Sequence, residues 1–149
     1  MKRRLPSPGV PGEEERGARL RHLGVESSGS PGNPRDILDT FANPRVGRAY
    51  EIRFEFPEFT SVCPVTGQPD FATITIEYVP NQLCVEMMSL KLYFFSYRNR
   101  GVFYEAVVNQ ILDDLVAVLK PKRMVVTGDF NVRGGMGARV VAKIGKGGN

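Results

Sequence analysis

The sequence predicts an α+β fold, in which a four-stranded, largely antiparallel sheet carries two helices on one of its faces. Two observations support this prediction. Residues 50–56 and 71–79 alternate apolar and polar residues as half-buried strands do, and residues 103–120 repeat apolar residues at helical spacing. Residues 89–97 are apolar enough to pack as a helix, and residues 124–130 and 138–144 are expected to be two more strands. Their order along the chain is strand, strand, helix, helix, strand, strand. Such segregation is typical of helices packed on one face of an antiparallel sheet.

The two ends of the chain differ in composition from its middle. Residues 1–45 are rich in Gly, Pro, Ser, Arg and Glu and poor in large apolar residues, so they bury too little surface to offset the entropy of ordering. We expect a disordered tail there, interrupted by one short helix at residues 35–41 that Asn33 caps. The folded domain is expected at residues 46–144, and residues 145–149 are expected to form a flexible tail.

The first two strands are expected at residues 50–56 and 71–79. In the first, Ile52, Phe54 and Phe56 alternate with charged residues, and residues 71–79 repeat the pattern. Residues 57–70 contain Pro57, Pro64, Gly67 and Pro69. We therefore expect a loop there that continues neither strand.

Two helices are expected at residues 89–97 and 103–120. The second repeats apolar residues at helical spacing and places Asp113 and Asp114 on its opposite, exposed side. Pro121 ends it, because proline lacks the N–H that a helix needs and clashes with the preceding turn. Two more strands are expected at residues 124–130 and 138–144, joined by a glycine-rich turn at 131–137. The open sheet has two edge strands, through which we expect the chain to form oligomers.

The composition excludes several classes of site. The single histidine, His22, lies in the N-terminal segment, so three-histidine zinc sites and Ser-His-Asp triads have no imidazole in the folded part. Cys63 and Cys84 form neither a disulfide framework nor a C-x-x-C pair, which favours a reducing compartment. No apolar run approaches the roughly 18–20 residues that span a bilayer. We expect a cytoplasmic protein with no membrane partner.

The net charge of +4 has two interpretations. Basic residues can form a surface that follows the phosphates of a nucleic acid, or they can belong to solvated tails. Much of the excess charge lies in the two terminal segments, and Glu13, Glu14 and Glu15 are interspersed in the first. The tail interpretation is favoured, and no direct nucleic-acid partner is expected.

Cys63 is the candidate nucleophile. It lies in a proline-bounded loop, where rigid neighbours can hold a reactive side chain at the surface. A free cysteine is also often a small buried hydrophobic residue, so spacing alone leaves both roles open. Asp70 can act as its base if the loop doubles back, and otherwise it is a residue at a strand edge.

Two glutamates fall at the starts of the expected helices. Glu86 and Glu105 can each interact favourably with a helix dipole, which is worth roughly 0.3–1 kcal/mol. Alternatively, a glutamate that faces a cleft can accept two parallel hydrogen bonds from the N–H and NH2 edge of a purine-like ligand. The residues alone do not decide between these roles.

Four linked segments resemble the single-domain, NADPH-dependent 7-cyano-7-deazaguanine (preQ0) reductases. The resemblance covers about residues 50–137 and preserves the spacing between the segments. The segments are residues 57–72 (PEFTSVCPVTGQPDFA), 86–93 (EMMSLKLY), 103–105 (FYE) and 128–135 (GDFNVRGG).

This resemblance implies the tunnelling fold, whose subunits join their sheets into rings with active sites at the subunit interfaces. Cys63 then attacks the nitrile carbon to form a covalent thioimidate, while Asp70 takes the thiol proton and returns one to the nitrogen. Two NADPH molecules deliver hydrides and yield the aminomethyl product (preQ1) used in queuosine modification of tRNA. The adduct makes chemical sense, because it turns a weakly electrophilic nitrile into a C=N unit that accepts hydride.

The resemblance also implies a set of residues that bind the substrate. Glu86 and Glu105 hold the edge of the deazaguanine, and Ser89 and Leu90 line the same pocket. Tyr104, next to Glu105, is expected to contact the substrate as well.

For the phosphates of NADPH, the candidates are Lys91 and Arg133. Other basic residues that can meet a phosphate are Lys120, Lys122 and Arg123. No G-x-G-x-x-G motif follows a strand, so a Rossmann site is not supported. No metal is required for the expected reaction.

Two segments depart from the family pattern. Met87 and Met88 stand where the family has a polar residue followed by lysine, and Tyr104 stands where it often has histidine. Tyrosine has an ordinary pKa of about 10, which makes it a poor proton shuttle near neutrality.

Two other functions remain as alternatives. A related group transfers an amine to the same nitrile within tRNA and needs no NADPH, and the missing lysine and basic charge favour it mildly. A purine-binding module with a vestigial Cys63 is the second alternative. The retention of both Cys63 and Asp70 argues against it.

Overall fold

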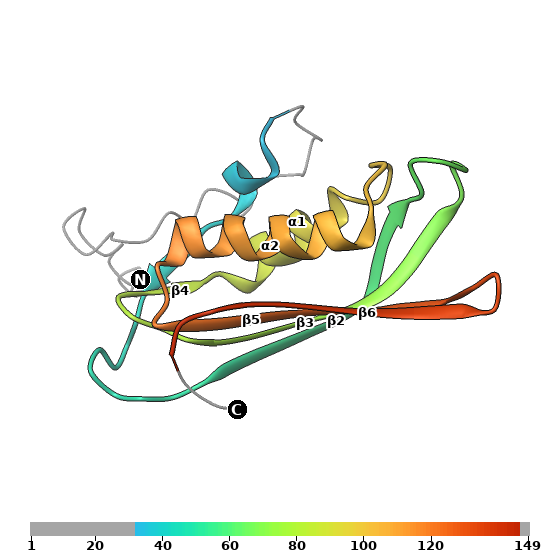
Figure 1. The fold of residues 1–149 in the computed structure, drawn as a ribbon. Helices are drawn as coiled ribbons and strands as arrows, with labels where there is room; N and C mark the ends of the chain where they lie inside the picture. The colour runs from blue at the N-terminus through green and yellow to red at the C-terminus, as the bar shows by residue number, and fades with distance from the viewer. Residues whose placement is uncertain (1–31, 147–149) are drawn as a thin grey trace, which may run out of the picture.

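The computed structural model describes residues 32–146, which form one four-stranded antiparallel sheet, a two-stranded sheet and two α-helices. The large sheet has the strand order β2-β3-β5-β6, and both helices lie on one of its faces (Figure 1). The α+β fold class is thus confirmed. The elements that build this arrangement are β2 (Ile52–Val62), β3 (Pro69–Val79), α1 (Met87–Phe95), α2 (Tyr104–Leu119), β5 (Arg123–Arg133) and β6 (Met136–Ile144).

The core lies between the sheet and the helices. The apolar stripe of α2 packs against β5 and β6, and the aromatic side chains of α1 pack against β2. Alternation along β3 sends Ile74, Ile76 and Tyr78 into this core, where all three are buried. Burial of this apolar surface is the main stabilising contribution to the fold.

Both hairpins of the sheet are longer than expected. The prediction that residues 57–70 form a loop was wrong, because β2 continues through Pro57 to Val62 and β3 begins at Pro69. Proline is tolerated here because β2 is an edge strand and its pairing with β3 shifts register between Phe56 and Phe59. The turn of the second hairpin is shorter than the expected 131–137, since only Gly134 and Gly135 separate β5 from β6. Both have positive φ, which glycine adopts without strain.

A small second sheet joins the segment before β2 to the segment after β3. β1 (Thr40–Ala42) pairs antiparallel with β4 (Leu83–Val85), and neither strand was expected. The short helix before them is capped by Asn33 as expected, but it is a 3₁₀ helix, η2 (Pro34–Ile37), and the expected extent of 35–41 was wrong. Leu38 is extended, so the chain leaves the helix and enters β1. The remainder of the expected N-terminal tail, residues 1–31, lies outside the described residues.

Asp114 is the clearest departure from the expected burial. It was predicted to lie on the exposed side of α2, and this was wrong, because Asp114 is only 1% exposed. Its carboxylate accepts hydrogen bonds from Arg35 (3.0 Å), Tyr93 (2.7 Å) and Gln110 (2.9 Å). A buried carboxylate needs such donors to offset its desolvation, and here they come from three elements.

Among residues 32–146, neither helix has both the length and the apolarity needed to cross a bilayer.

Candidate active site

Cys63 lies in the turn that joins β2 to β3. The turn is closed by hydrogen bonds from the Cys63 N–H to the Gln68 carbonyl (2.8 Å) and from the Gly67 N–H to the Cys63 carbonyl (2.9 Å). Gly67 has φ +70°, a conformation that favours glycine, so this residue allows the chain to double back. The turn therefore holds the cysteine in a defined position at the end of the hairpin.

The same turn is tied to the segment before α2. The Val62 N–H donates to the Arg100 carbonyl (3.0 Å), and the Val102 N–H donates to the Val62 carbonyl (3.1 Å). These bonds fix the end of β2 beside the start of α2, although the two are about forty residues apart in the chain. Tyr104, the first residue of α2, is thereby brought to the nucleophile loop.

The surroundings of Cys63 favour its thiolate. The pKa of Cys63 is lowered from 9.0 to about 6, first by the Thr66 hydroxyl and then by the backbone N–H groups of Thr66 and Val65 and by the Arg133 guanidinium. Burial acts in the opposite direction. Near pH 7 most of the cysteine is therefore ionised, and the thiolate is the nucleophilic form.

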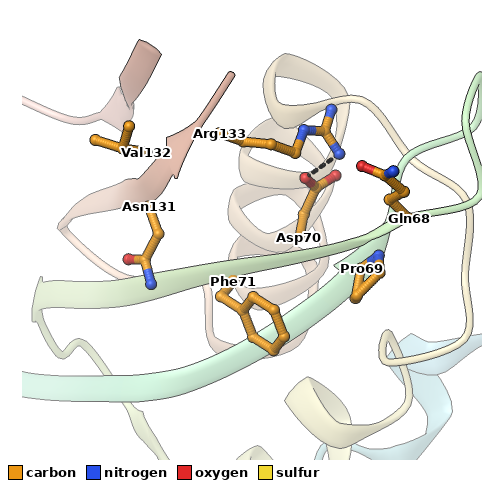
Figure 2. A pocket seen from close by; sticks show the side chains of 7 residues that line it. All are labelled: Gln68, Pro69, Asp70, Phe71, Asn131, Val132 and Arg133. Atoms are coloured by element: carbon orange, nitrogen blue, oxygen red, sulfur yellow. Dashed lines mark ion pairs between the residues drawn. The ribbon is translucent and has the colours of Figure 1, made fainter. Parts of the chain in front are cut away.

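Asp70 lies at the start of β3 and is 4% exposed. Its Oδ1 forms an ion pair with Nη1 of Arg133 at 2.6 Å and accepts a hydrogen bond from the Tyr104 hydroxyl at 2.9 Å. Figure 2 shows the Arg133 side chain reaching from β5 to this carboxylate. The site thus joins a thiolate, a carboxylate and a guanidinium.

Tyr104 is held by its ring as well as by its hydroxyl. The ring stacks on Phe130 with a centroid distance of 3.8 Å and an interplanar angle of 11°. Burial is the largest cause of the raised pKa of Tyr104, and the hydrogen bond to Asp70 raises this pKa further. Tyr104 therefore remains protonated near neutral pH and acts as a donor to Asp70.

A pocket of about 440 Å³ opens at this carboxylate. It lies between the ends of the two hairpins (Figure 2), and this volume falls in the range of small-ligand sites. Its lining includes residues that sequence reasoning missed, namely Gln68, Pro69, Phe71, Asn131 and Val132. All five are close in sequence to Asp70 or Arg133. The two groups of lining residues are brought together by the β3–β5 pairing of Ala72 with Phe130, a register that the sequence does not reveal.

Three of the expected substrate residues serve the fold of this chain. Glu86 caps α1, because its two carboxylate oxygens accept the N–H groups of Met88 (2.8 Å) and Ser89 (2.7 Å). The buried Ser89 hydroxyl accepts the Asp39 N–H and donates to the Glu86 carbonyl. Leu90 belongs to the hydrophobic core. None of the three lines the pocket at Asp70.

The remaining predicted site residues lie apart from one another. Glu105 is exposed in the first turn of α2, and Lys91 lines a separate hollow of about 70 Å³ between α1 and β2. Arg133, by contrast, is engaged at Asp70. A single chain thus brings together Cys63, Asp70, Tyr104 and Arg133, and does not gather the other predicted residues around them.

Neither cysteine of the chain is in a disulfide, and residues 32–146 contain no cluster of three or more side chains suited to hold a metal ion.

Comparison with known proteins identifies relatives along most of the chain. The model of the QueF-like protein family matches residues 69–148. The NADPH-dependent 7-cyano-7-deazaguanine reductase of Nitrosococcus oceani is 60% identical over 113 residues, which cover 76% of this chain and 88% of the relative. The protein of the same name from Anaeromyxobacter sp. (strain K) is 58% identical over 116 residues, covering 78% and 95%.

A solved structure has the same fold. The apo form of the archaeosine synthase QueF-Like superposes with a TM-score of 0.61 at 26% identity, covering 66% of this chain and 96% of that one. The family match spans more than half of the chain. The chain therefore belongs to the QueF-like family, in the branch of the NADPH-dependent 7-cyano-7-deazaguanine reductases.

Proposed function

We propose that this protein reduces the nitrile of 7-cyano-7-deazaguanine to an aminomethyl group at the expense of two NADPH molecules, in the supply of queuosine to tRNA. The observation that carries the proposal is the Cys63 thiol, whose pKa is lowered to about 6 beside the Asp70–Arg133 ion pair and a pocket of about 440 Å³. Its relatives at 58–60% identity bear the corresponding name.

The first step is a covalent addition. The Cys63 thiolate attacks the nitrile carbon, an S–C bond forms, and one electron pair of the C≡N bond moves to nitrogen. The nitrogen takes up a proton that comes from solvent, which leaves a thioimidate with a C=N bond. Asp70 shares the Arg133 guanidinium with Cys63 and is therefore near the reacting atoms, where it can relay that proton together with Tyr104.

NADPH, when bound, supplies the hydrides that reduce this C=N bond and then the imine released from the cysteine. Lys91 is the better candidate to meet its phosphates, because it is exposed on α1 while Arg133 is engaged at Asp70. Each molecule transfers two electrons, so two are needed to convert a nitrile into an amine.

We propose further that the complete site needs a second copy of the chain. The wall of the pocket leaves Phe71 52% exposed and Val132 72% exposed. Glu86 and Glu105, which the family resemblance assigns to the substrate, do not line the pocket of their own chain. A neighbouring subunit in a tunnelling-fold ring can supply them and cover the apolar wall. We also assign the protein to the cytoplasm, which fits its two free cysteines.

Two alternative functions remain. Similarity to an archaeosine synthase, together with Met88 where the family has lysine, favours NADPH-independent transfer of an amine to the same nitrile in tRNA. A purine-binding module is the other, and the thiolate-stabilising surroundings of Cys63 speak against it.

One assay separates these functions. Purified protein is mixed with 7-cyano-7-deazaguanine and NADPH, the nicotinamide absorbance is followed, and intact mass is recorded in parallel without NADPH. Reduction predicts two NADPH consumed per substrate, and Cys63→Ala abolishes both turnover and adduct. Cys84→Ala is the matched control, because Cys84 is equally free but lies away from the pocket.

The other outcomes are distinct. An adduct on Cys63 without any NADPH oxidation would replace reduction with amine transfer. Binding of the substrate without an adduct, and unchanged by Cys63→Ala, would leave only a binding role.

A further inference from the structure

The hydroxyl of Ser61 is fully buried and yet unpaired. Ser61 lies near the end of β2, two residues before Cys63, and it is 0% exposed. Among residues 32–146, its Oγ is the buried side-chain polar atom that has no hydrogen-bond partner. The large majority of buried side-chain polar atoms in native structures have such a partner, so this exception needs an explanation.

The register of the sheet places this hydroxyl beside Asp70. Ser61 pairs directly with Asp70 across the β2–β3 hairpin. Directly opposite residues of an antiparallel pair point to the same face, with Cβ atoms about 4.5–5.5 Å apart. Over that separation, a change of side-chain rotamer is enough to bring a serine hydroxyl within hydrogen-bond distance of a carboxylate.

The backbone at Ser61 is firmly held, so the unpaired hydroxyl does not result from a frayed strand end. β3 pairs with this part of β2 through Asp70 and Pro69. The next residue, Val62, bonds through its N–H to the Arg100 carbonyl and through its carbonyl to the Val102 N–H. The end of β2 therefore has neighbours on both sides, and the position of Ser61 is fixed.

The donors that now satisfy Asp70 both use one carboxylate oxygen. The Arg133 guanidinium contacts Oδ1 (Figure 2), and the Tyr104 hydroxyl donates to the same atom. The Tyr104 ring is fixed by its stack on Phe130, but its hydroxyl proton can rotate toward a ligand, and Tyr104 is expected to contact the substrate. The Asp70 side chain, which is 2% exposed, then needs another donor to offset its desolvation.

We propose that Ser61 is a positioning residue of the nitrile reduction: its hydroxyl turns to the Asp70 carboxylate when the substrate engages Tyr104, and it holds that carboxylate in place while the proton is relayed. Ser61 does not line the pocket, so it acts on the substrate through Asp70. Alanine would fill the same space without the cost of an unpaired buried hydroxyl, so packing alone does not explain the serine. This role rests on the proposed function.

The first test compares stability with turnover in Ser61→Ala. The urea midpoint of this variant is expected at or above the wild-type value, because no hydrogen bond of the free protein is lost. Its kcat should fall severalfold, while the KM values for 7-cyano-7-deazaguanine and NADPH stay near those of the wild type. A lowered urea midpoint would show that the hydroxyl is already paired, and an unchanged kcat would show that it is not used. Either result overturns the proposal.

Ser96→Ala is the matched control. It removes the same hydroxyl group from the end of α1, where Ser96 Oγ donates to the Tyr93 carbonyl at 2.6 Å. This variant loses a hydrogen bond, so its urea midpoint should fall while its kcat stays at the wild-type value. The opposite pattern is expected of Ser61→Ala, and the same pattern in both variants would contradict the proposal.

A second test separates Asp70 from the nucleophile. Alkylation of Cys63 by iodoacetamide needs the thiolate but no proton relay, whereas the adduct with the nitrile needs both. Ser61→Ala is expected to slow adduct formation, followed by intact mass without NADPH, and to leave the pH midpoint of alkylation unchanged. A shifted midpoint would place the action of Ser61 at the sulfur and refute the proposal.

The last test is a double-mutant cycle on the rate of adduct formation. In the Asp70→Asn background, Ser61→Ala should cause little further loss, because it acts through the carboxylate that is already missing. A full additional loss would assign Ser61 to another group and refute the proposal. A wild-type protein with neither adduct nor turnover would refute the proposed function, and this role with it. Wild-type activity that Ser61→Ala retains in full would refute the role of Ser61 alone.

Discussion

The thiol of Cys63 is tuned mainly by its own turn. The Thr66 hydroxyl is the largest cause of its lowered pKa, followed by backbone N–H groups of the same turn. Folding therefore stabilises the thiolate, so the ionisation of Cys63 makes the stability of the fold depend on pH. The contribution of the thiolate to stability is fully present above the unfolded pKa, near 9, and is lost as the pH falls through about 6.

Replacing Thr66 tests this source of activation. Thr66→Val keeps the β-branched shape but removes the hydroxyl, so we expect the midpoint of Cys63 alkylation to rise from about pH 6. Adduct formation with 7-cyano-7-deazaguanine at pH 6.0–6.5, a range chosen around that midpoint of about 6, should slow in proportion to the lost thiolate. Thr60→Val is the control, since the Thr60 hydroxyl donates to the nearby Glu58 carbonyl of its own strand. A midpoint that does not move would assign the low pKa to the backbone and Arg133 alone.

At the scale of elements, Asp114 ties η2, α1 and α2 together. It receives Arg35 from η2, Tyr93 from α1 and Gln110 from its own helix. Burial raises the pKa of Tyr93, so this hydroxyl stays protonated and donates to the carboxylate. Sequence reasoning placed Asp114 outside because of its charge, although it lies seven residues after Val107 and three after Ile111, on the buried stripe.

Asp114→Ala should therefore be costly. The buried Tyr93 hydroxyl loses its charged acceptor, and Arg35 loses its ion pair, so we expect the free energy of unfolding to fall by about 2–3 kcal/mol. The adjacent Asp113→Ala removes an exposed carboxylate and should change it by less than about 0.5 kcal/mol. Urea denaturation of both variants measures the difference, and equal stabilities would mean that the Asp114 cluster contributes nothing.

Gly128 connects the packing of α2 to the site. A Cβ at this position would lie 2.7 Å from Val108 Cγ2 and 2.8 Å from Phe130 Cε2. Gly128→Ala should cost about 1–3 kcal/mol of stability, because the buried core must shift to admit the methyl group. It should also lower turnover, since the displaced Phe130 ring carries the stacked Tyr104. Gly137→Ala, whose Cβ would meet Val132 at an ordinary 3.5 Å, is the control, and indistinguishable melting and turnover of the two variants would contradict this coupling.

The sequence allowed the main elements of the fold to be predicted, and its limits have physical causes. Alternation located β2 and β3 and helical spacing located α2, because each buries one face over many residues. Apolar segments between turn residues indicated α1, β5 and β6. β1 and β4 are three residues long and carry no period, so no pattern marked them. Cys63 and Asp70 were found from one continuous loop. The ion pair from Arg133 to Asp70 depends on strand register and a local shift of pairing, which no single segment encodes.

At the scale of the whole molecule, apolar surface remains uncovered in the described chain. Met87 and Phe95 lie eight residues apart on one face of α1, and each is more than half exposed, as are Phe71 and Val132 at the pocket. β2 and β6 are the outer strands of the sheet. Exposed apolar patches of this kind commonly mark interfaces between subunits, which agrees with the proposed ring.

Assembly is therefore expected to depend on the outer face of α1. Light scattering of the wild-type protein should give a multiple of the single-chain mass, and Phe95→Glu should lower it, because a carboxylate buried in an interface loses its solvation without a partner. The fold of the separate chain should persist, since Phe95 is 57% exposed and its ring stacks against the Arg98 guanidinium at the surface. Val46→Glu places the same charge at an equally exposed apolar position in the loop after β1 and serves as the control.

If the sites need a neighbouring subunit, Phe95→Glu loses turnover with 7-cyano-7-deazaguanine while alkylation of Cys63, which depends on groups of its own chain, keeps its midpoint near pH 6. A monomeric wild-type protein with full turnover would exclude a shared site, and an unchanged mass in Phe95→Glu would transfer the contact from α1 to the strand edges.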